Sequence, residues 1–222
     1  MIQHHNKTTQ TNAHAVILLA AGLSQRLGTP KQLLLRARLP LITHMLHIAL
    51  KSGAEKIIAV VPSYLPAVTT AVQSIKVPAN QLIVVQNDQS GLGMAHSLQL
   101  GIEALRIHAP ECGRVLIMGV DQIHLDSAHV TDLLAAVQPI AVSQYPASDT
   151  SSEDKQILGL PVVVEQAQLL AWYAKLSGDK GLRALIRHTD ITPHIVDNPK
   201  LSTDIDTPAQ LAHAKACGWL DA

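Results

Sequence analysis

Short aliphatic runs alternate along the chain with segments whose apolar residues have helical spacing. The aliphatic runs are residues 15–20, 56–61, 82–85, 115–120, 140–142 and 160–164. Two intervening segments carry apolar residues at i, i+3, i+4 and i+7, namely Ile42, Met45, Leu46 and Ala49, and Val130, Leu133, Leu134 and Val137. This spacing places them on one face of a helix. Near-continuous Val, Ile and Leu is typical of strands covered on both faces, so the pattern predicts an α/β fold with a mostly parallel sheet sandwiched by helices.

The chain length and this single rhythm predict one domain. The 222 residues lie within the usual range of a single domain. Residues 1–14 are polar and aperiodic, which predicts a flexible N-terminal tail in front of a domain at 15–222. The segment 143–156, SQYPASDTSSEDKQ, is rich in Ser, Asp, Pro and Thr. Its composition predicts a loop that is either mobile or a lid over a site.

Composition and charge narrow the class of protein. Apolar residues make up 47% of the chain and charged residues 15%, which excludes intrinsic disorder. The 17 Lys and Arg are balanced by 17 Asp and Glu, so the chain lacks the overall basic excess of nucleic-acid binders. A local basic patch is the one form of nucleic-acid site that this balance leaves open. Cys112 and Cys217 match no metal-ligand spacing. The apolar run at 15–21 is too short to span a membrane. We expect a cytoplasmic protein without membrane or nucleic-acid partners.

The segment after the first predicted strand, AAGLSQRLGTPK at 20–31, combines glycines with cations. Gly22 and Gly28 allow tight turns and close approach of the backbone to an anion, and Arg26 and Lys31 add positive charge. The glycine spacing matches neither the dinucleotide fingerprint G-x-G-x-x-G nor the P-loop. An ordinary turn with two solvated cations is the alternative. In α/β sheets such loops face the ligand, so the segment predicts a phosphate site.

Five stretches, taken in order, resemble the nucleotidyltransferases that attach a nucleotide to molybdopterin, and the molybdenum cofactor cytidylyltransferases in particular. The stretches are LAAGLSQRLGTPKQLL at 19–34, QN at 86–87 leading into GMAHSL at 93–98, DQ at 121–122, LSGDKGLR at 176–183, and DIDTP at 204–208. Together the resemblance covers residues 15–216. It implies a Rossmann-like nucleotidyltransferase fold, Mg²⁺ as cofactor and a nucleoside triphosphate as donor.

The resemblance also implies a reaction. Relatives that transfer cytidylyl groups tend to have Leu-Ala-Ala-Gly at the first stretch, where guanylyl-transferring ones have Leu-Ala-Gly-Gly. Residues 19–22 are LAAG, so we expect transfer of CMP from CTP to the phosphate of a molybdenum-loaded pterin, with a molybdenum hydroxylase or its maturation factor as partner. Three alternatives stay open: another acceptor such as a sugar or alcohol phosphate, GTP as donor, and a non-catalytic carrier of the dinucleotide cofactor. A carrier would need neither Lys31 nor Asp121.

The resemblance assigns the catalytic and metal-binding roles to five residues. Arg26 would hold the leaving pyrophosphate, and Lys31 would stabilise charge at the α-phosphate. Asp121, after a predicted strand, is the first expected Mg²⁺ ligand; the second is Asp206, with Asp204 as its rival. A second interpretation makes Asp121 a helix N-cap, but the pair 126–127 suits that position better. Asp206 also precedes Thr-Pro, as an N-cap residue does.

The remaining assignments concern binding. Besides Arg26 and Lys31, the expected nucleotide contacts are Leu19, Ala20, Ala21, Gly22, Ser24, Asn87, Gly93 and Ser97. The expected acceptor contacts are Asp179 and Arg183. Each of three polar residues has an ordinary alternative: Asn87 as a turn residue, Ser97 as a hydroxyl on a helix surface, and Arg183 as a solvated cation.

Overall fold

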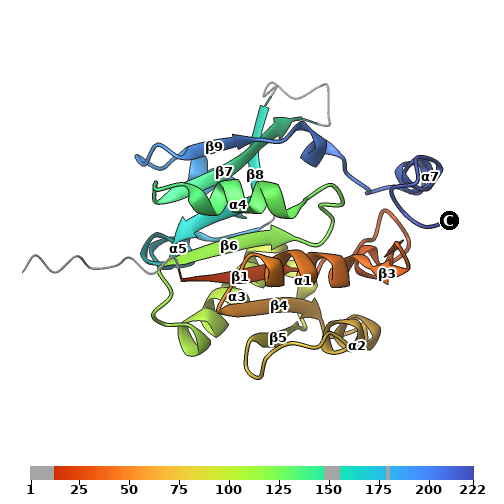
Figure 1. Cartoon of the computed structure of the whole chain (residues 1–222), viewed down its shortest axis with the longest axis horizontal. Coiled ribbons are helices and arrows are strands. Elements are labelled where there is room, and N and C mark those ends of the chain that lie inside the picture. Colours follow the sequence, from red (N-terminus) through yellow and green to blue (C-terminus); the bar gives the residue numbers. More distant parts are fainter. Residues whose placement is uncertain (1–12, 148–155, 179–180) are drawn as a thin grey trace, which may run out of the picture.

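The computed structural model describes residues 13–147, 156–178 and 181–222 and centres on a seven-stranded sheet of order β5-β4-β1-β6-β8-β7-β9 (Figure 1). Its strands are β1 (His14–Leu19), β4 (Lys56–Pro62), β5 (Leu82–Asn87), β6 (Arg114–Gly119), β7 (Ile140–Pro146), β8 (Gln156–Glu165) and β9 (His194–Asp197). A separate hairpin pairs β2 (Leu35–Arg36) with β3 (Leu39–Pro40). All six strands expected from the aliphatic runs are present.

The sheet is mostly parallel, as predicted, with one reversal. Strands β5, β4, β1 and β6 run in the same direction, and β9 is parallel to β7. Strand β8 is antiparallel to both of its neighbours, β6 and β7. The edge strand β9 and the small hairpin were not predicted. Strand β9 has four residues with alternating partial burial, so it carries no aliphatic run for the sequence pattern to detect.

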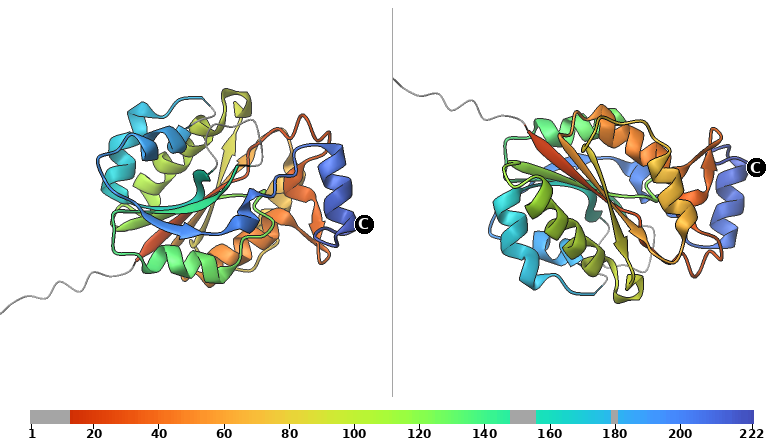
Figure 2. Two further views of the ribbon diagram at one scale, coloured as in Figure 1. Left: turned by 90° about the horizontal axis from the view of Figure 1, so that it is seen from above. Right: turned by 90° about the horizontal axis from the view of Figure 1, so that it is seen from below.

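Helices cover both faces of the sheet, as Figure 2 shows from above and below. Helices α1 (Leu41–Lys51), α2 (Pro66–Gln73) and α4 (Ser127–Ala135) pack on one face. Helices α3 (Met94–His108), α5 (Gln166–Trp172) and α6 (Gly181–Arg187) pack on the other. Helix α7 (Pro208–Ala216) lies beyond one end of the sheet (Figure 1). The short 3₁₀ turns are η1 (Lys31–Leu33), η2 (Ser90–Leu92), η3 (Tyr173–Lys175) and η4 (Pro199–Ser202).

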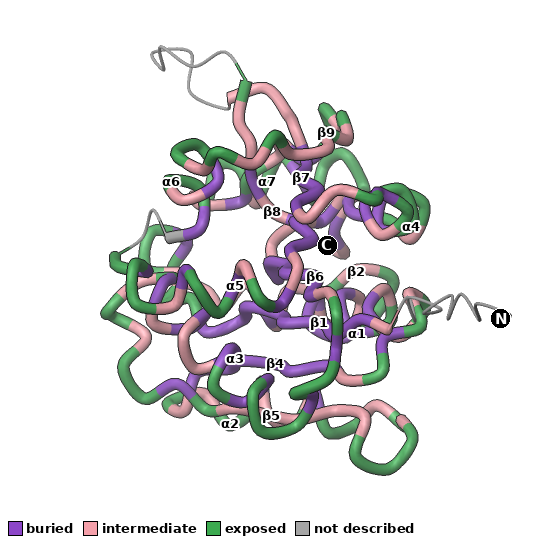
Figure 3. Tube along the Cα trace, turned by 90° about the vertical axis from the view of Figure 1, so that its left-hand side faces the viewer, coloured by how far each residue is buried: buried purple, intermediate pink, exposed green. Residues whose placement is uncertain are grey.

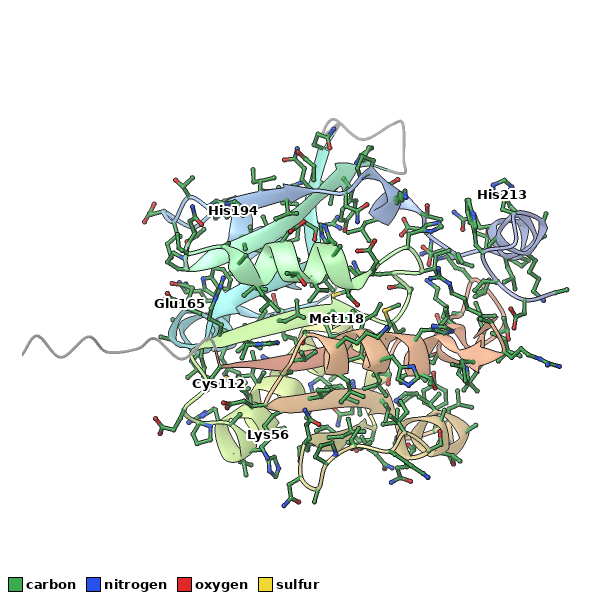
Figure 4. All side chains as sticks on the ribbon, viewed as in Figure 1. Lys56, Cys112, Met118, Glu165, His194 and His213 are labelled. Carbon is green, nitrogen blue, oxygen red and sulfur yellow. The ribbon has the colours of Figure 1, made fainter. Side chains whose placement is uncertain are left out.

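The central strands form the core. All six residues of β1 are buried, and the buried stretches of the Cα trace run through the middle of the molecule in Figure 3. Met118, on β6, is fully buried, whereas His213 projects from α7 at the periphery (Figure 4). One predicted core position is wrong. Val137 is 91% exposed, because α4 ends at Ala135 and the extended backbone at Ala136 takes it off the apolar face.

The chain deviates from expectation at two segment ends. Strand β1 begins at His14, one residue inside the expected tail, and the buried His14 ring bonds the Ser52 hydroxyl at 2.9 Å. The expected tail at 1–12 lies outside the described residues. Part of the expected loop at 143–156 is strand instead, since β7 continues to Pro146 and β8 begins at Gln156. The rest of that loop, 148–155, lies outside the described residues.

Two further expectations concern the membrane and the thiols. Within the described ranges, no helix combines the length and apolar character that crossing a membrane requires. Cys112 is buried and Cys217 is exposed, and both are free thiols. Burial raises the pKa of Cys112 to about 11, so this thiol is inert at neutral pH.

Candidate active site

The loop after β1 folds back on itself and brings two cations together. The Ser24 carbonyl accepts hydrogen bonds from the Leu27 and Gly28 N–H groups, each at 3.1 Å. The Ser24 hydroxyl accepts one from the Lys31 N–H, also at 3.1 Å. Gly28 has φ 74°, which explains the glycine there. The other left-handed residue of this turn is Ser24, with φ 52°, whereas Gly22 does not have a positive φ.

A buried glutamine, missed in the sequence, holds the start of this loop. The Gln32 side-chain amide donates to the Ala20 carbonyl at 2.7 Å and to the Gly22 carbonyl at 2.8 Å. Ala20 also donates its N–H to the Val60 carbonyl at 2.9 Å and is fully buried. Its backbone N–H and carbonyl are thus both bonded within the protein, and Ala20 lines neither of the cavities described below. The sequence signal that could have found Gln32 is its place directly after Pro-Lys, at the first turn of a 3₁₀ helix.

Four charged residues from three distant segments form one cluster. The Lys31 ammonium donates to Asp121 Oδ2 at 3.3 Å and to Asp206 Oδ1. The Arg26 guanidinium donates to Asp206 Oδ2 at 2.6 Å. The Lys31 side chain is only 12% exposed, whereas that of Arg26 is 75% exposed. The cluster thus joins the β1 loop, the turn after β6 and the segment before α7.

The local structure before α7 explains why the Asp206 carboxylate is available. Thr207, rather than Asp206, is the N-cap of α7: its hydroxyl accepts from the Gln210 N–H at 3.3 Å. The Gln210 side chain in turn accepts from the backbone N–H groups of Asp206 and Thr207, at 2.8 and 2.9 Å. Asp126 caps α4, as expected, by accepting from the His129 N–H at 2.9 Å. Neither Asp121 nor Asp206 is therefore used as a helix cap.

Mutual attraction keeps the cluster ionised. Burial lowers the pKa of Lys31, but the carboxylates of Asp121 and Asp206 outweigh it, so the Lys31 pKa is raised above 10.5. Burial raises the pKa of Asp206, but hydrogen bonding and charge from Lys31, with the charge of Arg26, lower it below 3.8 overall. The Lys31 ammonium and the Asp206 carboxylate therefore stay charged at neutral pH.

Two adjoining cavities meet at this cluster. The first, which we call the loop cavity, has a volume of about 540 Å³ and lies between the β1 loop and the start of α3; Arg26, Lys31 and Asp206 line it. The second, the α6 cavity, has about 550 Å³ and lies between β7, β8 and α6. Leu19, Met94, Asp121 and Leu160 line both. The shared wall allows two ligands to meet beside Lys31.

Most expected nucleotide contacts line the loop cavity: Leu19, Ala21, Gly22, Ser24, Gly93 and Ser97. Gly93, with φ 92°, is the N-cap residue of α3. Asn87 differs, because it is fully buried and lines neither cavity. Its amide donates to the Ser97 hydroxyl at 2.9 Å and its oxygen accepts from the Gln89 N–H at 2.8 Å. In this structure Asn87 holds Ser97 in place rather than facing a ligand.

The expected acceptor residues belong to the second cavity. Arg183, on α6, lines the α6 cavity, as does Asp204, which is exposed. Asp179 lies outside the described residues. Tyr145 also lines this cavity and was missed, because it falls in a stretch whose composition predicted a loop. Among the described residues, no group of three or more His, Cys, Asp or Glu converges on one point, so Asp121 and Asp206 are a two-carboxylate set.

Comparison with known proteins identifies the family. Residues 16–193 match the MobA-like NTP transferase domain. The chain belongs to this family. It is also 35% identical over 126 residues to the bifunctional protein GlmU of Clavibacter sepedonicus. That match covers 55% of this chain and 24% of the relative, so the chain spans about a quarter of GlmU.

Solved nucleotidyltransferase structures share the fold of this MobA-like domain. A homologue of Mycobacterium tuberculosis Rv0371c from Mycobacterium sp. strain JC1 superposes with a TM-score of 0.71 at 24% identity, over 93% of this chain and 97% of its own. Rv0371c in complex with manganese gives 0.66 at 22% identity, over 90% and 97%. The 4-diphosphocytidyl-2C-methyl-D-erythritol synthase of Anaerococcus prevotii gives 0.73 at 14% identity, over 92% and 95%. The expected α/β nucleotidyltransferase fold is confirmed.

Proposed function

We propose that this enzyme transfers CMP from CTP to the phosphate of molybdenum-loaded molybdopterin, releases pyrophosphate and depends on Mg²⁺. One observation carries the proposal. The Lys31 ammonium lines the loop cavity and contacts Asp206 and Asp121, and Asp121 lines the α6 cavity as well. A largely buried cation next to a carboxylate shared by two cavities suits a reaction in which a phosphate from one ligand attacks a phosphate of the other.

The loop cavity suits the nucleotide donor. Its wall beside β1 is built from Leu19, Ala21 and Gly22, and small residues there leave room for a base against the backbone. Arg26 is exposed at the same cavity, where its fork-shaped guanidinium suits the pyrophosphate group. The choice of CTP rests on the LAAG residues, and the fold shared with a synthase named for a diphosphocytidyl product agrees with it.

The two carboxylates fit a divalent cation. Asp121 and Asp206 converge on one point, which Lys31 Nζ contacts in this structure. Mg²⁺ in nucleotide sites takes one or two carboxylates and completes its shell with phosphate oxygens and water, so two carboxylates suffice. The manganese complex of Rv0371c, which has the same fold, supports a divalent metal here. When bound, the metal would neutralise phosphate charge.

The reaction breaks one bond and forms one. An oxygen of the acceptor phosphate forms a bond to the α-phosphorus of CTP, and the bond from that phosphorus to the oxygen leading to the β-phosphate breaks. Pyrophosphate leaves with the electron pair. Lys31 would stabilise the charge that develops at the α-phosphate, because its raised pKa keeps it cationic. Arg26 would hold the departing pyrophosphate.

The α6 cavity suits an acceptor that carries a flat ring and a phosphate. Much of its lining is aliphatic, including Leu98, Ile117 and Ile186, with Arg183 as a cation for a phosphate. Gln122 and Thr203 also line it and can pair with the ring nitrogens and oxygen of a pterin, since a polar group left unpaired costs about 1–3 kcal/mol. The aliphatic residues favour contact with the flat face of such a ring over contact with a sugar, which carries hydroxyls on every side.

Pyrophosphate release tests the proposal. Purified protein is incubated with Mg²⁺, molybdenum-loaded molybdopterin and one of CTP, GTP or ATP. We expect release with CTP alone, lost in Asp121→Ala and kept in Asp197→Ala, which removes an exposed carboxylate on the edge strand β9. Equal use of CTP and GTP would refute the donor assignment. Binding of CTP without release, followed by release when glucose 1-phosphate replaces the pterin, would refute the acceptor.

A further inference from the structure

Tyr145 lines the α6 cavity, and the local structure of β7 and β8 fixes its position there. A β-bulge between Val142 and Ser143 shifts the register of β7 against β8, so that Ser143 pairs with Gly159 and Tyr145 with Ile157. The Tyr145 ring leans over Gly159: a Cβ atom added to that glycine would lie 3.0 Å from Tyr145 Cζ and would collide with the hydroxyl oxygen. Any side chain at position 159 would therefore displace the ring.

The bulge that aims Tyr145 is anchored from inside the core. The Ser143 hydroxyl donates to the Pro161 carbonyl at 2.7 Å and bonds the His129 ring, also at 2.7 Å. Ser143 is fully buried and His129 is 5% exposed. Two buried side-chain bonds on the residue two positions before Tyr145 fix the strand there, so the ring has a defined direction.

The Tyr145 hydroxyl is directed at a charge from another element. Arg183, on α6, is close enough to lower the pKa of the Tyr145 hydroxyl by its charge and by hydrogen bonding, and the carboxylates of Asp204 and Asp121 act on it in the opposite direction. Burial raises the pKa of Tyr145, and this outweighs the opposing effect of Arg183, so the hydroxyl keeps its proton at neutral pH. Tyr145 thus links Arg183 to the side of the cavity that Asp121 shares with the loop cavity.

We propose that Tyr145 determines which acceptors the enzyme takes. Its ring forms a flat apolar wall, and its hydroxyl holds the Arg183 guanidinium toward the acceptor's phosphate. We expect the selected acceptors to be phosphomonoesters that carry a flat ring system. A flat ring can stack on the Tyr145 side chain, whereas a polyol gains only one hydrogen bond from it. The inference rests on the proposed function for the acceptor's place in the α6 cavity. Tyr145 does not line the loop cavity, so we expect it to have no effect on binding of the nucleotide donor.

Two substitutions test the hydroxyl and the position of the whole side chain. Tyr145→Phe keeps the ring and removes the hydroxyl; Gly159→Ala displaces the ring together with its hydroxyl. Gly113→Ala is the matched control, since a Cβ there meets no atom within 4 Å. Binding of molybdenum-loaded molybdopterin and of glucose 1-phosphate is measured by calorimetry without nucleotide. CTP binding and the KM values for pyrophosphate release are measured separately, and thermal unfolding checks that each variant folds.

We expect Tyr145→Phe to weaken molybdopterin binding and raise its KM about tenfold, as for a lost hydrogen bond to a charged group. Gly159→Ala should weaken molybdopterin binding at least as much, and Gly113→Ala should leave it unchanged. CTP affinity should stay within about twofold in all three, on the usual scatter of such comparisons. Wild-type molybdopterin affinity in Tyr145→Phe would overturn the inference and leave the proposed function intact. Tyr145-dependent binding of glucose 1-phosphate alone would overturn both the proposed pterin acceptor and the flat-ring selection. Wild-type protein that binds neither acceptor would overturn both proposals.

Discussion

Lys31 is the residue on which the charge balance of the site depends. It is largely buried, and its ammonium contacts carboxylates that come from two other segments of the chain. Such a position suits a compact point charge on a flexible stem. An arginine there would place a broad planar group between Asp121 and Asp206, so even this charge-conserving exchange alters the site.

Removal of the Lys31 ammonium should reduce turnover more than binding. We expect Lys31→Ala to lower kcat by about 10²–10³-fold, the usual cost of losing one donor that stabilises transition-state charge. The affinity for CTP should change far less, because Arg26 and the loop backbone remain. Steady-state kinetics with CTP and molybdopterin measure the first effect and calorimetry the second. Lys51→Ala, on the exposed end of α1, serves as control. A variant with unchanged kcat would contradict the role.

The Asp206 carboxylate should also make stability depend on pH. Its folded pKa is depressed below 3.8, so its ion pairs stabilise the fold above that pH and are lost as the pH falls through the folded value. Lys31, with a pKa raised above 10.5, contributes stability below that pH and loses it above. We expect the unfolding free-energy difference between wild type and Asp206→Asn to be level near neutrality and to shrink at both extremes. Urea titrations across pH test this; a level difference below pH 3.8 would refute it.

At the scale of elements, helix α7 positions the Asp206 carboxylate of the charge cluster from outside the sheet. Its capping box uses Thr207 and Gln210, and the same Gln210 oxygen holds the Asp206 N–H. Cap and site are therefore one hydrogen-bonded unit. Helix α4 has an equivalent N-cap in Asp126, but no residue of the charge cluster lies next to that cap. The two caps make a natural pair for separating stability from activity.

We expect both cap removals to destabilise the protein and only one to impair the site. Thr207→Ala and Asp126→Ala should each cost about 1 kcal/mol of unfolding free energy, as N-cap losses usually do. Thr207→Ala should in addition lower the affinity for Mg²⁺ with CTP, because the Thr207 hydroxyl donates to the Gln210 side-chain oxygen that holds the Asp206 N–H, and its loss loosens that anchor. Urea unfolding and calorimetry provide the two measurements. Equal metal affinity in both variants would show that α7 does not position Asp206.

At the scale of the whole molecule, the two halves of the sheet contribute different cavities. The parallel strands β1 and β6 lead into the loop cavity, whereas the antiparallel pair β7 and β8 carries much of the α6 cavity. Asp121, at the end of β6, belongs to both. A ligand in the loop cavity contacts segments from residue 19 to residue 206 and should therefore stabilise the whole domain.

Ligand binding should raise the unfolding temperature in a metal-dependent way. At CTP concentrations about 100 times the Kd, mass action adds roughly 2.7 kcal/mol to the unfolding free energy. For a domain of this size that corresponds to a rise in Tm of about 5–10 °C. We expect EDTA or Asp121→Ala to remove most of this rise, and scanning calorimetry measures it. A rise that persists in full under EDTA would contradict the two-carboxylate metal site.

The sequence by itself determined which segments are strands, helices and chemistry-bearing loops. Burial on both faces requires uninterrupted Val, Ile and Leu, so the aliphatic runs identified six of the sheet strands, including β1 and β6. Charge and glycine are equally direct signals, which is why Arg26, Lys31 and Asp121 stand out in the sequence alone. Such local requirements act within a few residues and are therefore readable from the chain.

Only the tertiary structure decided strand direction, and which polar residues face a ligand. A buried strand has the same composition whether parallel or antiparallel, so the reversal of β8 left no sequence signal. The sequence does not reveal that the Asn87 amide bonds Ser97 inside the core, or that Asp204 lines the α6 cavity whereas Asp206 lines the loop cavity. Tyr145 gained its place only through the bulge and Gly159. These outcomes depend on contacts between segments far apart in the chain, and a side chain's neighbours are set by packing rather than by its local sequence.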